Sequence, residues 1–187
     1  LSMLMLAGIR DILIISTPED LPKYKSLLSS GKSIGMNFLY KEQVSPDGLA
    51  QALILGEEFI GNENVCLILG DNIFYGSNLP QTLRSAVKKV NDSNIATVFG
   101  YYVNDPERYG VVSFDSNKKV TKIEEKPPSP KSNYAVTGLY IYPSSVVDIA
   151  MSVKKSNRGE DEISVINNIF LKMEKLNVEL LDQDYVW

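Results

Sequence analysis

Short runs of apolar residues alternate along the first seventy residues with segments whose apolar residues recur at helical spacing. The run at 65–69 (VCLIL) has no polar alternation, which is typical of a strand buried on both faces of a parallel sheet. Similar strands are expected at 12–15 and 37–40, and helices at 18–28 and 49–59. This alternation of strands and helices predicts a parallel sheet with right-handed crossovers.

The pattern changes after the strand expected at 95–103. Three strands follow one another with turns but no helix between them, which indicates an antiparallel insertion or sheet edge. The fold class is therefore expected to be α/β, a Rossmann-like, mostly parallel sheet flanked by helices, in one domain over 1–187. The further expected elements are helices at 2–7, 79–90, 144–153 and 162–174, and strands at 95–103, 109–114, 119–124, 135–142, 178–181 and 185–187.

Composition narrows the chemistry that is possible. The 187-residue chain has no histidine, which excludes Ser-His-Asp and Cys-His catalysis and every His-ligated metal site. Its single cysteine, Cys66, lies within an apolar run, so we expect no disulfide and favour a reducing cytoplasm. A net charge of −4 and the lack of a long apolar stretch predict neither a nucleic-acid partner nor a membrane span. Catalysis would then use carboxylates, lysines, backbone amides and a bound ion.

Asp71 follows the apolar run after Gly70, where the strand is expected to meet a loop. In open α/β sheets, ligands bind at the carboxyl ends of the strands, so a carboxylate there can hold a metal that holds a phosphate. The alternative is that Asp71 and Asn72 only cap the next turn, because both residue types favour turns.

Seven short motifs, taken in order, carry a resemblance that covers essentially the whole chain. They lie at 4–10 (LMLAGIR), 43–52 (QVSPDGLAQA), 69–72 (LGDN), 105–111 (DPERYGV), 124–127 (EEKP), 135–140 (AVTGLY) and 158–163 (RGEDEI). Together they resemble the glucose-1-phosphate thymidylyltransferases, a family of sugar-nucleotide pyrophosphorylases. One motif alone would be weak evidence, whereas seven in one order are specific.

The resemblance implies transfer of a thymidylyl group from dTTP to α-D-glucose 1-phosphate, giving dTDP-glucose for dTDP-rhamnose and polysaccharide biosynthesis. It implies Mg²⁺ as the cofactor, with Asp71 as one ligand and a second aspartate expected shortly after Trp187. Lys126 would bind the sugar phosphate as a point charge, and Glu125 would accept hydrogen bonds from sugar hydroxyls. The alternative for 124–126 is a solvated run of charges that ends a strand.

The same resemblance implies which residues contact the base and which contact the sugar. Gln43 and Gly48 would read the thymine, because an amide both donates and accepts and a glycine lets the backbone approach closely. The alternative for this pair is a loop glutamine and a glycine at a helix start. Asn72, Gly110 and Val136 would line the sugar.

A last group of charged residues has two interpretations. Arg158, Glu160 and Glu162 would either anchor the sugar phosphate or form a surface ion network that contributes little. The sequence favours neither interpretation.

Two parts of the family pattern are expected outside the chain. The glycine-rich loop, with its arginine and lysine, is expected before residue 1, and the second metal-binding aspartate after residue 187. We therefore expect the 187 residues to be a fragment that is inactive by itself. The missing first strand is expected between the strands at 12–15 and 65–69. For the parent enzyme, the resemblance implies a homotetramer with feedback by a deoxysugar nucleotide.

Three other functions are alternatives to this one. A uridylyltransferase of the same fold would use UTP, whose base lacks the methyl group of thymine, and burial of that methyl group is worth roughly 1 kcal/mol. A non-catalytic paralogue would bind sugar nucleotides and regulate a partner. A dinucleotide-dependent oxidoreductase is disfavoured, because no G-x-G-x-x-G follows any expected strand.

Overall fold

Most elements lie within a few residues of where the apolar pattern predicts them. The computed structural model describes residues 1–45, 47–76, 78–153, 162–182 and 184–187. Its strands are β1 (Asp11–Ser16), β2 (Asn37–Glu42), β3 (Val65–Ile68), β4 (Ala96–Tyr102), β5 (Gly110–Phe114), β6 (Val120–Glu125), β7 (Tyr134–Tyr142) and β8 (Leu176–Leu181). Its α-helices are α1 (Ser2–Leu6), α2 (Leu21–Leu28), α3 (Gln51–Leu55), α4 (Glu57–Ile60), α5 (Leu79–Ser93), α6 (Val146–Ser152) and α7 (Ile163–Lys172). Short 3₁₀ turns lie at Lys32–Ile34 and Pro106–Arg108.

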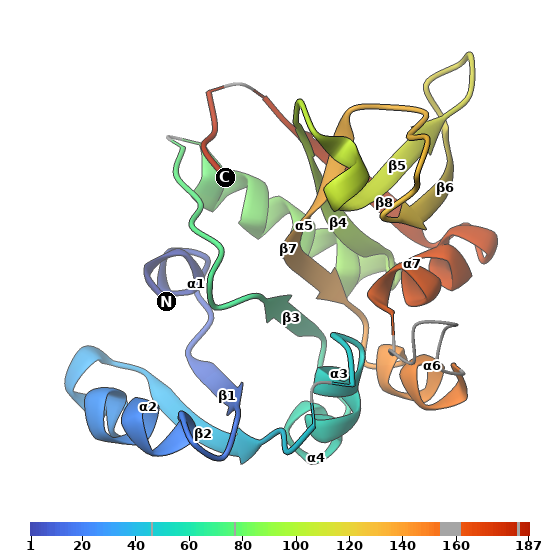
Figure 1. Cartoon of the computed structure of the whole chain (residues 1–187). Helices are drawn as coiled ribbons and strands as arrows, with labels where there is room; N and C mark the ends of the chain where they lie inside the picture. The colour runs from blue at the N-terminus through green and yellow to red at the C-terminus, as the bar shows by residue number, and fades with distance from the viewer. Residues whose placement is uncertain (46, 77, 154–161, 183) are drawn as a thin grey trace.

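The described strands form two sheets (Figure 1). β1 and β2 pair in parallel as a two-stranded sheet. The larger sheet has the order β6-β5-β7-β4-β8, and β3 joins it by pairing with β7. Within it β4 and β8 are parallel, and the other pairs are antiparallel. The α/β class is therefore confirmed, with parallel and antiparallel pairs mixed.

β7 is the strand around which the larger sheet is built. β4 pairs with it from Tyr134 to Ile141 and so occupies one of its edges. Because a strand has only two hydrogen-bonding edges, β3 and β5 share the other edge. β5 meets that edge at Ala135 and β3 meets it from Leu139 onward. The two strands therefore diverge around residues 136–138, and this fork positions the site described below.

Helices cover both faces of this sheet. One core cluster packs α3, α6 and α7 against one face, and Tyr140 and Tyr142 of β7 belong to it. The other packs α5 against the opposite face, and it contains the alternating residues Leu139 and Ile141. The alternation follows from the pleat, which points successive side chains to opposite faces. No helix in the described part of the chain is both long and apolar enough to span a bilayer.

Three sequence predictions differ from the structure. β3 was expected in a parallel sheet, but it pairs antiparallel with β7, because an apolar run carries no information on the direction of the neighbouring strand. β3 was also expected to be buried on both faces, but it is only half-buried. The helix expected at 49–59 is divided into α3 and α4 at Gly56, whose backbone leaves the helical conformation. The strand expected at 185–187 is a single antiparallel bridge between Val186 and Tyr75, because Tyr75 itself lies outside the named strands.

β1 and β3 line a common cavity without pairing to each other. The cavity has a volume of about 100 Å³ and is lined by apolar side chains that include Leu13, Leu53 and Leu67. The strand that the sequence predicts between β1 and β3 stays a prediction.

Candidate active site

A pocket of about 310 Å³ opens at the fork where β3 and β5 diverge along β7. Val136 and Gly138 of β7 form its floor, and the first turn of α7 lies beside it. Just past β3, the backbone N–H of Leu69 donates to the carbonyl of Gly138 at 2.9 Å, which is the last rung before the strands separate. The sheet topology itself therefore creates the opening.

The pocket gathers most of the residues that the sequence singled out. Those that line it are Asp71, Asn72, Gly110, Glu125, Lys126, Val136 and Glu162. They come from the loop after β3, from β5, β6 and β7, and from the start of α7. The remaining predictions lie elsewhere: Gln43 and Gly48 are not in the wall, although the adjacent Leu49 is. Arg158 and Glu160 fall outside the described residues.

Asn72 holds Asp71 in place at one end of the pocket. Its Oδ1 accepts the backbone N–H of Gly138 at 3.0 Å and the indole Nε1–H of Trp187 at 2.6 Å. Two donors on one oxygen fix the orientation of the amide, so Nδ2 is the atom that faces Asp71. That nitrogen donates to Asp71 Oδ1 at 2.8 Å. Both amide atoms of Asn72 are thus engaged by protein, which makes it a support for Asp71 as well as part of the wall.

Gly138 permits this arrangement because it has no side chain. A Cβ at this position would lie 2.5 Å from Asn72 Oδ1 and 2.7 Å from Leu69 Cδ1. Real Cβ contacts are never that short, so any side chain here would displace Asn72. At the fork, the backbone N–H of Gly138 therefore pairs with the side-chain amide of Asn72 instead of with the backbone of a neighbouring strand.

Lys126 lies at the pocket after the end of β6. Its backbone has φ 40°, a left-handed conformation that costs a non-glycine residue roughly 1–2 kcal/mol. Its backbone N–H donates to the carbonyl of Tyr109 at 2.9 Å, which holds this conformation. The pairing of Gly110 with Glu125 brings the two strand ends together at the pocket. Strain at a residue beside a pocket points toward a functional role for that residue.

The two acids before Lys126 point to different sides of β6. Glu125 lines the pocket, whereas Glu124 bonds Lys122 at 2.8 Å on the outer side. That hydrogen bond lowers the pKa of Glu124. Glu124 fits the solvated-charge interpretation of this motif, whereas Glu125 faces the pocket, because the pleat turns successive side chains to opposite faces.

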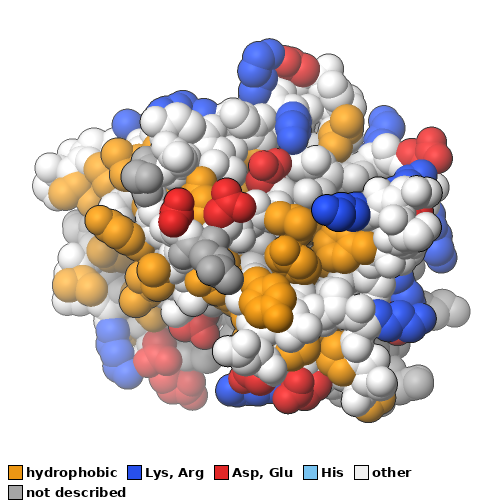
Figure 2. Space-filling view, turned by 90° about the horizontal axis from the view of Figure 1, so that it is seen from above, with side chains coloured by type: hydrophobic (Ala, Val, Ile, Leu, Met, Phe, Trp, Pro, Cys, Tyr) orange, Lys and Arg blue, Asp and Glu red, His pale blue; other side chains and the backbone are white. Residues whose placement is uncertain are grey.

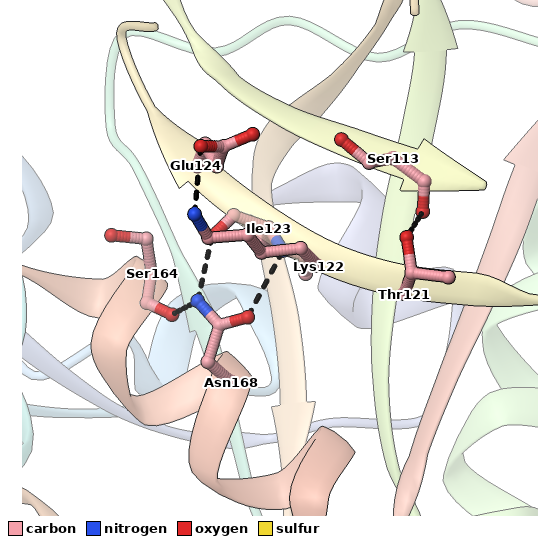
Figure 3. Close-up of polar contacts among 7 residues, drawn as sticks. All are labelled: Ser113, Thr121, Lys122, Ile123, Glu124, Ser164 and Asn168. Atoms are coloured by element: carbon pink, nitrogen blue, oxygen red, sulfur yellow. Dashed lines mark hydrogen bonds and ion pairs between the residues drawn. The ribbon is translucent and has the colours of Figure 1, made fainter. Parts of the chain in front are cut away.

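Asn168 of α7 joins the helix to the outer edge of β6 (Figure 3). Its Oδ1 accepts the backbone N–H of Ile123 at 3.0 Å, and its Nδ2 donates to the carbonyls of Ile123 at 2.6 Å and Ser164 at 2.8 Å. The amide therefore pairs with the strand as a neighbouring backbone would. It ties the first turn of α7, with Glu162 and Ser164, to the strand that carries Glu125.

Gln43 and Gly48 lie on the chain that leads into α3. Gly48 has φ 109°, a left-handed conformation that glycine adopts more readily than residues with a side chain. The half-buried Gln43 follows β2, and its Nε2 donates to Oε1 of Gln51 in the first turn of α3. Contact of either residue with a base stays a prediction.

Several pocket residues were not predicted from the sequence. They include Tyr140, Ser164, Asn167 and Trp187. Burial, and to a smaller extent the nearby Glu125, raises the pKa of the Tyr140 phenol, which stays a neutral donor. The available signal for Ser164 and Asn167 was their i, i+3 spacing, which places the two side chains on one face of α7.

The charge around the pocket is mixed, because its wall contains three acidic and two basic residues, Asp71, Glu125, Glu162, Arg108 and Lys126. On the face shown in Figure 2, acidic and basic side chains are likewise interspersed with hydrophobic ones. The described side chains on this face therefore form no continuous basic field of the kind that binds nucleic acid.

Comparisons with known proteins concern the sequence and the fold of the whole chain. Residues 1–187 match the nucleotidyl transferase family. The chain is 55% identical over its full length to glucose-1-phosphate thymidylyltransferase of Neisseria gonorrhoeae and 53% identical to that of Xanthomonas campestris. It spans 64% and 62% of the length of these two relatives.

Solved structures show the same fold. A Bacillus anthracis protein that is assigned as a glucose-1-phosphate thymidylyltransferase superposes with a TM-score of 0.87 at 41% identity, over 98% of this chain and 72% of its own. A UDP-glucose pyrophosphorylase bound to UDP-glucose superposes with a TM-score of 0.81 at 24% identity, over 97% of this chain and 76% of its own. The second likeness concerns the fold alone. The match over the whole chain shows that the protein belongs to the nucleotidyl transferase family.

Proposed function

We propose that the protein transfers a thymidylyl group from dTTP to α-D-glucose 1-phosphate, giving dTDP-glucose and pyrophosphate. The observation that carries this proposal is the single pocket to which separate strands bring Asp71, Glu125 and Lys126. The thymidylyltransferases to which the chain is 53–55% identical support this choice of substrates.

The reaction needs positioning and charge neutralisation more than covalent chemistry from the protein. A phosphate oxygen of the sugar attacks the α-phosphorus of dTTP, and the bond from that phosphorus to the pyrophosphate breaks in line. Lys126 would hold the sugar phosphate as a point charge while Glu125 accepts hydrogen bonds from sugar hydroxyls. The roles fit their positions, because both residues lie at the same end of β6. Val136 and Gly110 would form the wall against the sugar ring.

The carboxylate of Asp71 suits a magnesium ion that is shared with phosphates. Among the described residues no three acidic or cysteine side chains gather in a way that could hold a metal ion. Mg²⁺ takes one or two carboxylates and completes its octahedron with phosphate oxygens and water. Bound beside Asp71, it would neutralise part of the charge of the triphosphate. Asn72 would keep the carboxylate turned toward the ion through the hydrogen bond to Asp71 Oδ1.

The remaining parts of the proposal concern recognition of the base, the oligomeric state and cellular location of the protein, and the charged residues near the sugar phosphate. Gln43 and Gly48 would read thymine from the loop that precedes α3. We further propose a cytoplasmic homotetramer, on the resemblance of the chain to its family. Of the three charged residues Arg158, Glu160 and Glu162, only Glu162 belongs to the described part of the chain, and from the pocket wall it would face the sugar phosphate.

The test is a direct assay of the intact gene product. dTTP, glucose 1-phosphate and Mg²⁺ are supplied, and dTDP-glucose and pyrophosphate are measured in parallel. Equal amounts of both products, each requiring both substrates, are expected. Preference for UTP over dTTP would reassign the protein as a uridylyltransferase, and nucleotide binding without product would favour the regulatory paralogue.

A further inference from the structure

Three side chains form a hydrogen-bonded relay between the end of β2 and the start of α3. Gln43 Nε2 donates to Gln51 Oε1 at 2.5 Å, and Gln51 Nε2 donates to Asp47 Oδ2 at 3.0 Å. All three residues are partly buried. They bracket Gly48 and Leu49, and Leu49 is part of the pocket wall.

The relay has a direction, and Asp47 sets it. An ionised carboxylate only accepts hydrogen bonds, so the atom of Gln51 that faces Asp47 must be its nitrogen. The oxygen of Gln51 then faces Gln43, and the atom of Gln43 that meets it must be its nitrogen. The oxygen of Gln43 is turned away from the relay, and it makes no hydrogen bond to any described residue.

A glutamine that is fixed in this way can distinguish classes of nucleobase. Thymine and uracil carry an N–H donor at N3, whereas cytosine has an acceptor there. An amide that rotates through 180° could serve either class, because its two ends have opposite hydrogen-bonding character. An amide held with its oxygen outward accepts from the first class and opposes an acceptor on the second.

We infer that Asp47 and Gln51 are positioning residues that hold the Gln43 oxygen toward the base and so select N3-protonated pyrimidines over cytosine. This inference rests on the proposed function, in which Gln43 reads the base. Asp47 and Gln51 act through Gln43 and need not contact the nucleotide. Reversal of the relay would place Gln51 Oε1 against Asp47 Oδ2, two acceptors in contact, and this opposes rotation of the Gln43 amide.

The test compares Asp47→Asn with the double variant Asp47→Asn/Gln51→Glu in the intact gene product. An asparagine at 47 can donate or accept, so the single variant no longer specifies the direction. In the double variant the carboxylate at 51 accepts from both Gln43 and the amide at 47, which restores the direction. The pair also keeps its original net charge of −1.

The measured quantity is the ratio of kcat/KM for dTTP to that for dCTP. Asp47→Asn is expected to lower this ratio roughly tenfold, and the double variant is expected to restore it. The KM for glucose 1-phosphate should not change in either variant. An unchanged ratio in Asp47→Asn, or an equal loss with both nucleotides that the double variant fails to rescue, would overturn the relay.

Two controls separate this inference from the proposed function. If the wild-type protein does not use dTTP, or if Gln43→Ala leaves its use unchanged, the assignment of the base-reading residue fails. If Gln43→Ala impairs dTTP use while Asp47→Asn preserves the ratio, only the relay fails. Gln51→Met is the second variant should Asp47→Asn not fold, and it is also expected to lower the ratio.

Discussion

Replacement of Asn168 by alanine should reveal how firmly α7 is tied to β6. The change removes three hydrogen bonds. Asn168 Oδ1 accepts one from the backbone N–H of Ile123, and Nδ2 donates one to the carbonyl of Ile123 and one to the carbonyl of Ser164. Ile123 is only 2% exposed, so water cannot easily replace the amide. An unsatisfied buried backbone group costs about 1–3 kcal/mol, and two groups of Ile123 are affected. We therefore expect the free energy of unfolding to fall by about 2–6 kcal/mol.

The measurement is urea denaturation of the intact gene product, followed by circular dichroism. Asn64→Ala is the matched control, because its amide donates to Asn91 at 2.7 Å on the exposed surface. The control should change stability by less than about 0.5 kcal/mol. The KM for glucose 1-phosphate should rise in Asn168→Ala, because Glu162 and Glu125 lose their common support. A loss of stability no larger than that of Asn64→Ala would refute the role given to Asn168.

Three further predictions test the pocket and the sheet. Gly138→Ala should lower kcat/KM at least about tenfold, because its Cβ would displace Asn72, while Gly70→Ala, which meets open space, should be nearly neutral. Lys126→Ala should raise the KM for glucose 1-phosphate about tenfold or more and change that for dTTP much less, and the reverse pattern in steady-state kinetics would reassign the residue. Burial raises the pKa of Cys66 to about 12, so at pH 8 iodoacetamide should label it roughly a thousandfold more slowly in the native protein than in urea. Equal rates of labelling would show that this thiol is not buried.

Much of the fold could be predicted because apolar periodicity is a local signal. The helix expected at 79–90 was correctly predicted and corresponds to α5, in which Leu83, Ala86 and Val90 are buried. The direction of β3 could not be predicted, because the same apolar run suits a parallel or an antiparallel neighbour. That direction depends on β7, which lies some seventy residues later in the chain. The division of the helix at Gly56 was missed for a related reason, since a helical glycine is often tolerated.

For the site as well, sequence motifs identified residues, but they did not reveal contacts between residues that are far apart in the sequence. The resemblance picked out seven residues that the structure brings to one pocket, although their roles remain predictions. Sequence reasoning could not foresee that Trp187 would reach Asn72, because the contact joins residues 115 positions apart. It likewise took Asn72 as a sugar contact or as a residue that caps a turn, whereas its amide atoms are engaged by Gly138, Trp187 and Asp71. Such contacts depend on the topology of the sheet, which the motif alone does not encode.

The most direct test of the account is the effect of Asp71→Asn on dTDP-glucose formation by the intact gene product across a Mg²⁺ titration. The substitution preserves the shape of the side chain and removes its charge, so kcat should fall about 10²–10³-fold and the Mg²⁺ requirement should shift to higher concentration. Asp92→Asn is the control, because Asp92 is exposed and pairs only with Lys88 among the described residues. Near-normal turnover in Asp71→Asn, with an unchanged requirement for the ion, would contradict the assignment of this carboxylate to the metal.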